Sequence, residues 1–283
     1  MENLIAWIIR AIPFGTIIMY GAMGEILTEK SGNLNLGVPG IMYLGGFAGF
    51  ASSYYYEKLM PNPNAVVCVI IALVCCLAAS MLGGLIFSFL TITLRANQNV
   101  TGLALTIFGM GVANFFGVFI LNGASYTAAP LANSAFAQKI PVLSSKLGVV
   151  SQTVFSYGFL VYAAIIIAVI FHLILNKTRV GLNLRAVGEN PATADAAGIS
   201  VTRYKYLATC IGAGLSGIGG LYYVLDYNQG IWATTEQIEA LGWLAVALVI
   251  FTTWKPLNAI WGAYLFGMLY WLYQFLPNLL ALR

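Results

Sequence analysis

Residues 65–94, AVVCVIIALVCCLAASMLGGLIFSFLTITL, contain no charged side chain. A helix needs about 20 apolar residues to cross a hydrocarbon core, so this stretch is long enough to span a membrane. The whole chain of 283 residues agrees, because 60% of it is hydrophobic and only 8% is charged, against roughly a quarter in soluble domains. The sequence therefore predicts a polytopic membrane protein in which residues 1–283 form one transmembrane domain.

The hydropathy pattern divides the chain into eight apolar segments, at residues 4–24, 34–56, 65–93, 98–121, 153–175, 203–225, 238–253 and 256–275. Lipid offers no partner for a free backbone amide, and no segment alternates as a membrane barrel does. We therefore predict an all-α integral membrane protein with about eight transmembrane helices. The first segment carries Arg10 and Pro13 and is followed by no small-residue cleavage site, so we expect a retained helix.

The most basic loop lies between the fifth and sixth segments. Residues 177–205 carry five of the thirteen Lys and Arg residues, and cytoplasmic loops are enriched in these residues. If loop 176–202 is cytoplasmic, alternation of the spans places both termini outside. The inner side then holds Lys30, Arg95, Lys177, Arg179, Arg185, Arg203, Lys205 and Lys255, against Lys58, Lys139, Lys146 and Arg283 outside.

The second apolar segment opens with a polar, glycine-rich stretch, EKSGNLNLGVPGIMYLGG at residues 29–46. Its residues fit two structures: a helix broken at membrane depth beside protein or a water-filled path, or a plain interfacial turn. Small residues at every fourth position predict strips on which helices pack closely: Gly45 and Gly49, then Gly212, Ser216 and Gly220. The polar connection 122–151 is expected outside, either as a partner-binding segment or as an ordinary surface loop.

The side-chain inventory contains no catalytic constellation. The chain has one histidine, no phosphate-binding loop and no metalloprotease or hydrolase motif. Most acidic residues lie at segment ends, which disfavours an intramembrane enzyme and an ion-coupled carrier. The basic residues are scattered, so no nucleic acid is expected as partner. We interpret His172 as an interfacial side chain, and the four cysteines, Cys68, Cys75, Cys76 and Cys210, as small hydrophobes rather than metal ligands.

Loop 176–202 has the composition of a short helix rather than of a linker. Asn190 fits an N-cap, Pro191 fits the first turn, and Gly198 fits the helix end. A helix of about two turns, held between two spans, is suited to transmit force to a partner. An ordinary surface helix fits the same pattern.

The quoted motifs also carry a family resemblance. GLNLRAVGENPATADAAGISVTRYK (residues 181–205) resembles the coupling-helix loop of bacterial ABC importer permeases that serve branched-chain amino acids, simple sugars and nucleosides. GEILTEKSGNLNLGVPGIMYLGGFAGF (24–50), LRANQNVTGLALTIFG (94–109) and LGWLAVALVIFTTWKPLNAIWGAYLFG (241–267) are similar to further segments of that branch, in order. The resemblance covers essentially the whole chain and is strongest for the nucleoside subgroup. Pro39 stands where that subgroup commonly has Glu.

The resemblance implies a permease subunit in the bacterial inner membrane, without enzymatic activity of its own. Its partners would be a second homologous permease, a cytoplasmic ABC ATPase that binds ATP and Mg²⁺, and a lipid-anchored or periplasmic solute-binding protein; the permease itself would need no cofactor. Residues 189–199 would form the lever, with Ala194, Ala197 and Gly198 as a small contact face. The full set expected to contact the ATPase is Glu189, Asn190, Pro191, Thr193, Ala194, Asp195, Ala197 and Gly198.

The solute path is expected along the second, third and fourth segments. Unpaired amides are costly in lipid, so the polar side chains there should face one another, backbone or water. We predict Asn35, Ser88, Asn99 and Asn114 as path residues, with Phe108 as an aromatic wall. Interhelical hydrogen bonding without a transport role is the alternative for each. Nucleosides are the expected solute, with riboflavin, simple sugars or branched-chain amino acids as alternatives, and an ATP-independent secondary carrier as a different class.

Overall fold

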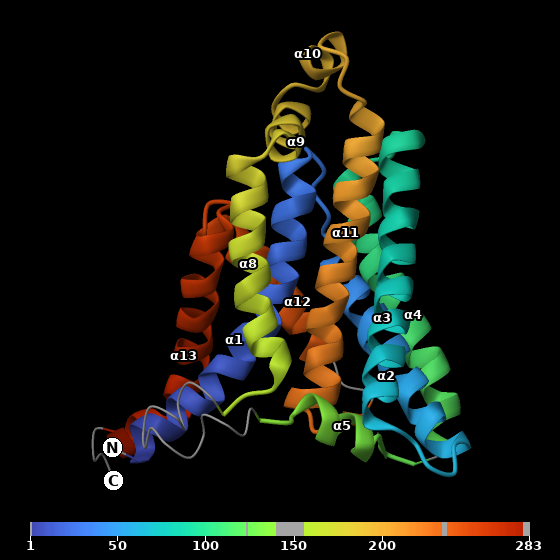
Figure 1. The fold of residues 1–283 in the computed structure, drawn as a ribbon, viewed down its shortest axis with the longest axis vertical. Coiled ribbons are helices and arrows are strands. Elements are labelled where there is room, and N and C mark those ends of the chain that lie inside the picture. Colours follow the sequence, from blue (N-terminus) through green and yellow to red (C-terminus); the bar gives the residue numbers. More distant parts are fainter. Residues whose placement is uncertain (1, 123, 140–155, 234–236, 280–283) are drawn as a thin grey trace.

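The computed structural model describes residues 2–122, 124–139, 156–233 and 237–279, and these are largely helical (Figure 1). The long helices are α1 (Glu2–Lys30), α2 (Val38–Leu59), α3 (Ala65–Ser88), α4 (Gln98–Leu121), α8 (Phe159–Lys177), α11 (Val201–Tyr222), α12 (Gln237–Phe251) and α13 (Pro256–Leu279). Two π-helical turns, η1 (Phe89–Thr93) and η2 (Tyr223–Tyr227), extend α3 and α11. Shorter elements are α5 (Pro130–Phe136), α9 (Arg179–Glu189), α10 (Pro191–Ala196), β1 (Thr127–Ala128) and β2 (Ile231–Trp232).

Each predicted apolar segment corresponds to one of the long helices, which confirms the all-α polytopic architecture. Five helices in the described ranges are long and apolar enough to cross a membrane, at Leu4–Lys30, Ala65–Thr93, Gln98–Leu121, Phe159–Lys177 and Val201–Tyr227. Helix α12, at 15 residues, is shorter than the usual span. The count of about eight transmembrane helices therefore stays a prediction.

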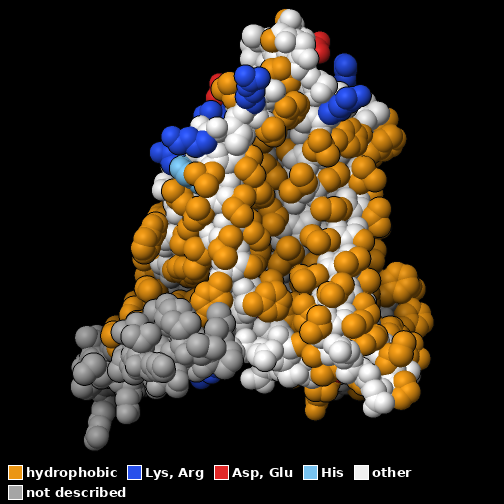
Figure 2. Space-filling model, viewed as in Figure 1, with side chains coloured by type: hydrophobic (Ala, Val, Ile, Leu, Met, Phe, Trp, Pro, Cys, Tyr) orange, Lys and Arg blue, Asp and Glu red, His pale blue; other side chains and the backbone are white. Residues whose placement is uncertain are grey.

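The helices run between two ends of the molecule (Figure 1). Helix α10 forms one tip, which we call the α10 end, and the start of α1, the end of α13 and α5 lie toward the opposite end. The α1–α2, η1–α4 and α12–α13 connections lie toward the α10 end, so Lys30, Arg95 and Lys255 share it with loop 176–202, as the sequence predicts. On the face in Figure 2, Lys and Arg side chains gather near α10 and hydrophobic side chains cover the middle. Lys146 and Arg283 lie outside the described residues.

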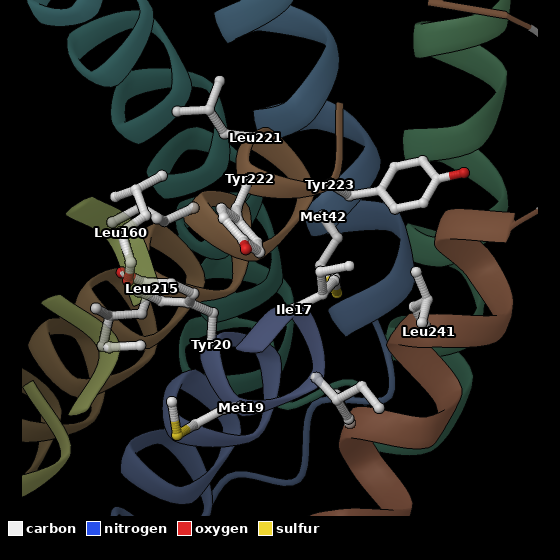
Figure 3. Packing of buried hydrophobic residues seen from close by; sticks show 14 of the residues in the cluster. Ile17, Met19, Tyr20, Met42, Leu160, Leu215, Leu221, Tyr222, Tyr223 and Leu241 are labelled. Carbon is white, nitrogen blue, oxygen red and sulfur yellow. Dashed lines mark hydrogen bonds between the residues drawn. The ribbon is translucent and has the colours of Figure 1, made fainter. Parts of the chain in front are cut away.

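The centre of the bundle is built on α1 and α11. Of the 18 consecutive residues taken as the apolar part of each span, 78% are buried in the span that contains α11 and 22% in the span that contains α3. Helix α11 is therefore central and α3 peripheral. Figure 3 shows Ile17 and Tyr20 of α1 close to Met42 of α2 and to Leu215 and Tyr222 of α11. The Tyr20 hydroxyl donates to the carbonyl oxygen of Leu160 at 2.8 Å, which satisfies its polar atom and ties α8 to α1.

The predicted small-residue strips lie at helix crossings. A Cβ built on Gly220 would lie 1.9 Å from the carbonyl oxygen of Met42, and one on Gly212 would lie 2.4 Å from that of Gly24. One on Gly45 would lie 2.6 Å from Gly217 Cα. These backbones approach so closely that a methyl group would push the helices apart, which confirms the packing role of the strips. All four cysteines are free, with Cys68 and Cys76 buried and the other two half-buried.

Within the glycine-rich stretch at 29–46, residues 31–37 form a turn between two helices, so of the two structures that fit the sequence the chain does not adopt the broken second helix. Helix α1 ends at Lys30 and α2 begins at Val38, with Pro39 in its first turn, where the missing amide costs nothing. We call the connection between them, residues 31–37, the α1–α2 turn. Ser31, Asn33 and Asn35 are almost fully buried in it. Protein therefore surrounds these three polar side chains.

The end opposite α10 carries a small cap in the described part of 122–151. The strands β1 and β2 pair antiparallel, with Thr127 opposite Trp232. Glu57, near the end of α2, accepts hydrogen bonds from the amides of Leu131 and Ala132 at 3.2 and 2.7 Å. Its negative charge thus lies at the positive end of α5 and holds the cap against α2.

Candidate coupling loop and solute path

The loop between α8 and α11 folds into two helices, α9 and α10. The Thr178 hydroxyl caps α9 by accepting from the amide of Gly181 at 3.2 Å. Asn190 joins the helices: its amide donates to Ala186 O at 3.0 Å, and its side-chain oxygen accepts from the amide of Thr193 at 3.0 Å. The predicted cap at Asn190 and the predicted first-turn Pro191 are therefore present.

Helix α10 is six residues long and ends where the sequence predicts. Gly198 has φ +79°, a left-handed conformation that glycine adopts at little cost, and Ile199 N–H donates to Ala194 O at 3.0 Å. Most side chains of residues 189–198 are exposed, including Glu189, Asp195 and Ala197. Ala194 is an exception at 2% exposure. It packs against its own chain, so its predicted place on the contact face does not fit this structure.

Sequence reasoning missed α9. Its buried side recurs at Gly181, Leu184 and Val187, a three-residue spacing that could have revealed a helix. The amide group of Asn183 also donates to the Tyr204 hydroxyl at 3.0 Å, which ties α9 to α11. The helical part of the loop is therefore larger than residues 189–199, the range expected to form the lever, because α10 follows directly on a second helix joined to the bundle.

A polar cavity of about 260 Å³ lies beside the contact between the base of the loop and the end of α1. It is lined by Glu29, Lys30, Arg185, Gly188, Glu189 and Trp254. The indole N–H of Trp254, in the α12–α13 connection, donates to the Glu29 carboxylate at the end of α1. Glu29 Oε1 and Arg185 Nε are buried and have no hydrogen-bond partner among the described residues. Charged groups from α1 and α9 thus face a common space.

The α1–α2 turn connects several helices at the α10 end. The amide of Asn35 donates to Glu25 Oε1 at 2.7 Å, within the same hairpin of helices. The side chain of Asn33 donates to Thr209 of α11 at 3.2 Å. The amide of Leu34 donates to the side-chain oxygen of Gln98, in the first turn of α4, at 2.8 Å. Sequence reasoning did not assign Glu25 and Gln98 a role, since pairing across helices cannot be read from spacing.

The five predicted path residues fall into two groups. Asn35 and Ser88 are 2% and 0% exposed, and the Asn35 side chain accepts from the amide of Gly37 at 2.9 Å. Asn99, Phe108 and Asn114 are exposed on α4. Phe108 also borders an apolar cavity of about 200 Å³ between α3 and α4, with Phe87 and Leu105. Asn35 stabilises the turn, so the exposed face of α4 is the better candidate for a path, and this role stays a prediction.

Fold and loop together describe a multi-pass α-helical membrane protein that presents a short capped helix beyond its spans. Among the described residues, no group of three or more His, Cys, Asp or Glu side chains could hold a metal ion. The chain belongs to the family described as branched-chain amino acid transport system / permease component, whose model matches residues 7–281. It is thus an ABC transporter permease of the cell membrane, and its relatives are transport subunits rather than enzymes.

Curated relatives share most of the chain. A protein named as a putative glucose ABC transporter permease, TsgC13 of Haloferax volcanii, is 32% identical over 91% of this chain and 74% of its own length. The guanosine ABC transporter permease NupQ of Bacillus subtilis is 30% identical over 90% of this chain and 78% of its own. The nucleoside ABC transporter permease NupC of Lactococcus lactis is 28% identical, with the same two coverages. No solved structure matches the chain.

Proposed function

We propose that this chain forms half of the translocation path of an ATP-driven importer, with nucleosides as solutes, and that α10 docks on a cytoplasmic ATPase. The observation that carries the coupling role is the capped helix α10, exposed beyond the spans at the end where the basic loop residues lie. Positively charged loops are typical of the cytoplasmic side. A second permease subunit and an external solute-binding protein complete the assembly, and ATP and Mg²⁺ bind the ATPase.

The exposed face of α4 supports the location of the path. Helix α4 packs mainly against α2 and leaves Asn99, Phe108 and Asn114 uncovered. An amide that faced hydrocarbon would lose its hydrogen bonds with water at a cost of several kcal/mol. A face that carries Asn114 in mid-helix is therefore better suited to an aqueous path or a subunit contact than to lipid.

The side chains on this face of α4 and the names of the relatives both favour nucleosides as the solutes. Phe115 follows Asn114 directly and Phe119 lies about one helical turn further along α4, with the two ring centroids 5.3 Å apart. Both rings are more than half exposed. Aromatic walls suit a base, and amide groups suit the hydroxyls of a sugar. Relatives named for guanosine or nucleosides support this solute, and relatives named for glucose support a simple sugar as the second candidate.

Uptake measurements decide between the solutes. Radiolabelled adenosine, guanosine, uridine, glucose and riboflavin are compared in a strain that lacks this chain and in the complemented strain. Loss of nucleoside uptake that complementation restores is the expected result. Loss of glucose or riboflavin uptake alone would reassign the solute, and solute movement by the purified chain in liposomes without an ATPase would replace the importer by a secondary carrier.

The coupling and path assignments have separate tests. Asp195→Lys reverses an exposed charge on α10 and should leave the chain inserted while it lowers solute uptake per ATP hydrolysed. Asn114→Ala should lower transport more than it lowers the amount of assembled complex. Equal losses of transport and assembly for Asn114→Ala would indicate a purely structural amide.

A further inference from the structure

One of the contacts between the coupling loop and the bundle joins two glycine backbones. A Cβ built on Gly188, near the end of α9, would lie 2.3 Å from the carbonyl oxygen of Lys30 and 3.1 Å from the amide nitrogen of Gly32. One built on Gly32 would lie 3.2 Å from Gly188 Cα, and Gly32 has φ +85°. The obstructing atoms are backbone atoms, so neither element has a flexible side chain that could absorb a displacement of the other.

Next to this contact the packing is open. The cavity of about 260 Å³ lies between the charged side chains of α1 and α9, among them Glu29 and Arg185. A layer of interlocked side chains would spread a movement of α9 over many contacts. On the side of α9 that faces the cavity, the backbone contact at Gly188 is therefore a direct route to the α1–α2 turn. On its other sides, Gly181 and Asn183 join α9 to α8 and α11.

The α1–α2 turn is joined in the same way to α4. The Thr106 hydroxyl donates to the carbonyl oxygen of Leu36 at 3.0 Å. A Cβ built on Gly102 would lie 2.7 Å from the amide nitrogen of Leu36, and Gln98 accepts from the amide of Leu34 at 2.8 Å. These three contacts occupy the first half of α4. Apart from these contacts, α4 packs mainly against α2. A shift of the α1–α2 turn therefore moves α4, the helix that carries the exposed Asn114.

We propose that Gly188, the α1–α2 turn and Thr106 form a relay that carries movement of the coupling loop to α4. Gly188 and Thr106 are then positioning residues of the transport cycle: they touch neither solute nor ATPase, and they act through the helices they connect. The relay rests on the proposed function, because it assigns the route by which ATP-driven movement of α10 reaches the solute path.

The chain offers a matched control for Gly188. Gly181 lies in the same helix, and its Cβ would lie 2.2 Å from the carbonyl oxygen of Ile174 in α8, a clash as severe but directed away from the α1–α2 turn. Gly188→Ala and Gly181→Ala thus make the same chemical change in α9 against different neighbours. Any loss of stability from overpacking is expected in both.

The experiment uses the complete complex with its ATPase and binding protein in lipid. Gly111→Cys serves as reporter on α4, since Gly111 is exposed and its Cβ would have no neighbour within 4 Å; it is introduced after the four native cysteines are replaced. Labelling of this cysteine is measured with and without ATP, together with ATP hydrolysis and solute uptake. In the control Gly181→Ala the ATP-dependent change in labelling should persist. In Gly188→Ala it should fall at least about five-fold per assembled complex, with less solute moved per ATP.

Thr106→Val keeps the relay testable if Gly188→Ala fails to assemble. Valine has nearly the shape of threonine but lacks the hydroxyl that binds Leu36, so the ATP-dependent labelling change should fall while ATP hydrolysis continues. Equal effects of Gly188→Ala and Gly181→Ala, or an intact labelling change in Thr106→Val, would overturn the relay. A normal complex that shows neither ATP-dependent labelling nor ATP-dependent uptake would instead overturn the proposed function, and the relay with it.

Discussion

Replacing Asn190 by alanine removes the hydrogen bond that starts α10. The bond joins the Asn190 side-chain oxygen to the amide of Thr193 at 3.0 Å, and the helix that it starts has only six residues. Isolated helices this short are unstable in water, so α10 depends on its ends and on the buried Ala194. Loss of an Asn N-cap costs about 1 kcal/mol. Since 1.4 kcal/mol corresponds to a factor of ten, α10 should open about five times more often.

Hydrogen–deuterium exchange followed by mass spectrometry measures this opening in the purified protein. Peptides that cover residues 190–200 should exchange about five-fold faster in Asn190→Ala than in the unmodified chain, while peptides from α11 should not change. Asn190→Asp retains an acceptor at the cap and adds a charge favoured at a helix start, so its exchange should stay near normal. Unchanged exchange in Asn190→Ala, or equal acceleration by both substitutions, would refute the reasoning.

Three further predictions test the architecture. On a cysteine-free background, Met60→Cys should react with a membrane-impermeant reagent in intact cells and Thr193→Cys should not; labelling at 193 would reverse the orientation. Gly220→Ala places a methyl group 1.9 Å from Met42 O and should cost about 1–3 kcal/mol of stability, measured as a lower midpoint of thermal unfolding. The control Gly111→Ala meets no neighbour within 4 Å and should leave the midpoint unchanged, so equal midpoints for the two variants would contradict the packing role. Glu57→Ala removes the acceptor for two α5 amides and should destabilise α5 by about 1–3 kcal/mol. Hydrogen–deuterium exchange of residues 130–136 should then be faster, whereas Glu57→Gln keeps one acceptor and should accelerate this exchange less.

Several features of this chain follow from local patterns in its sequence. The length of an apolar run and the requirement that every amide be bonded within its own helix located the long helices, because both are properties of one segment. The cap at Asn190 and the end at Gly198 were predictable for the same reason, since an N-cap and a left-handed terminal glycine act within a few residues. The absence of a catalytic set likewise needs only the residue inventory.

The sequence by itself thus determined an all-α membrane permease with a short capped helix in its basic loop. Only the tertiary structure decided that Ala194 and Asn35 are buried and that Gly188 meets Gly32 of the α1–α2 turn. The contact of Gly188 with Gly32 joins two elements far apart in the chain, and the burial of Ala194 and Asn35 depends on what packs over them. Glycine, alanine and asparagine have the same local propensities whether they face lipid, solute or a neighbouring backbone, so what each one touches is set by how the helices pack.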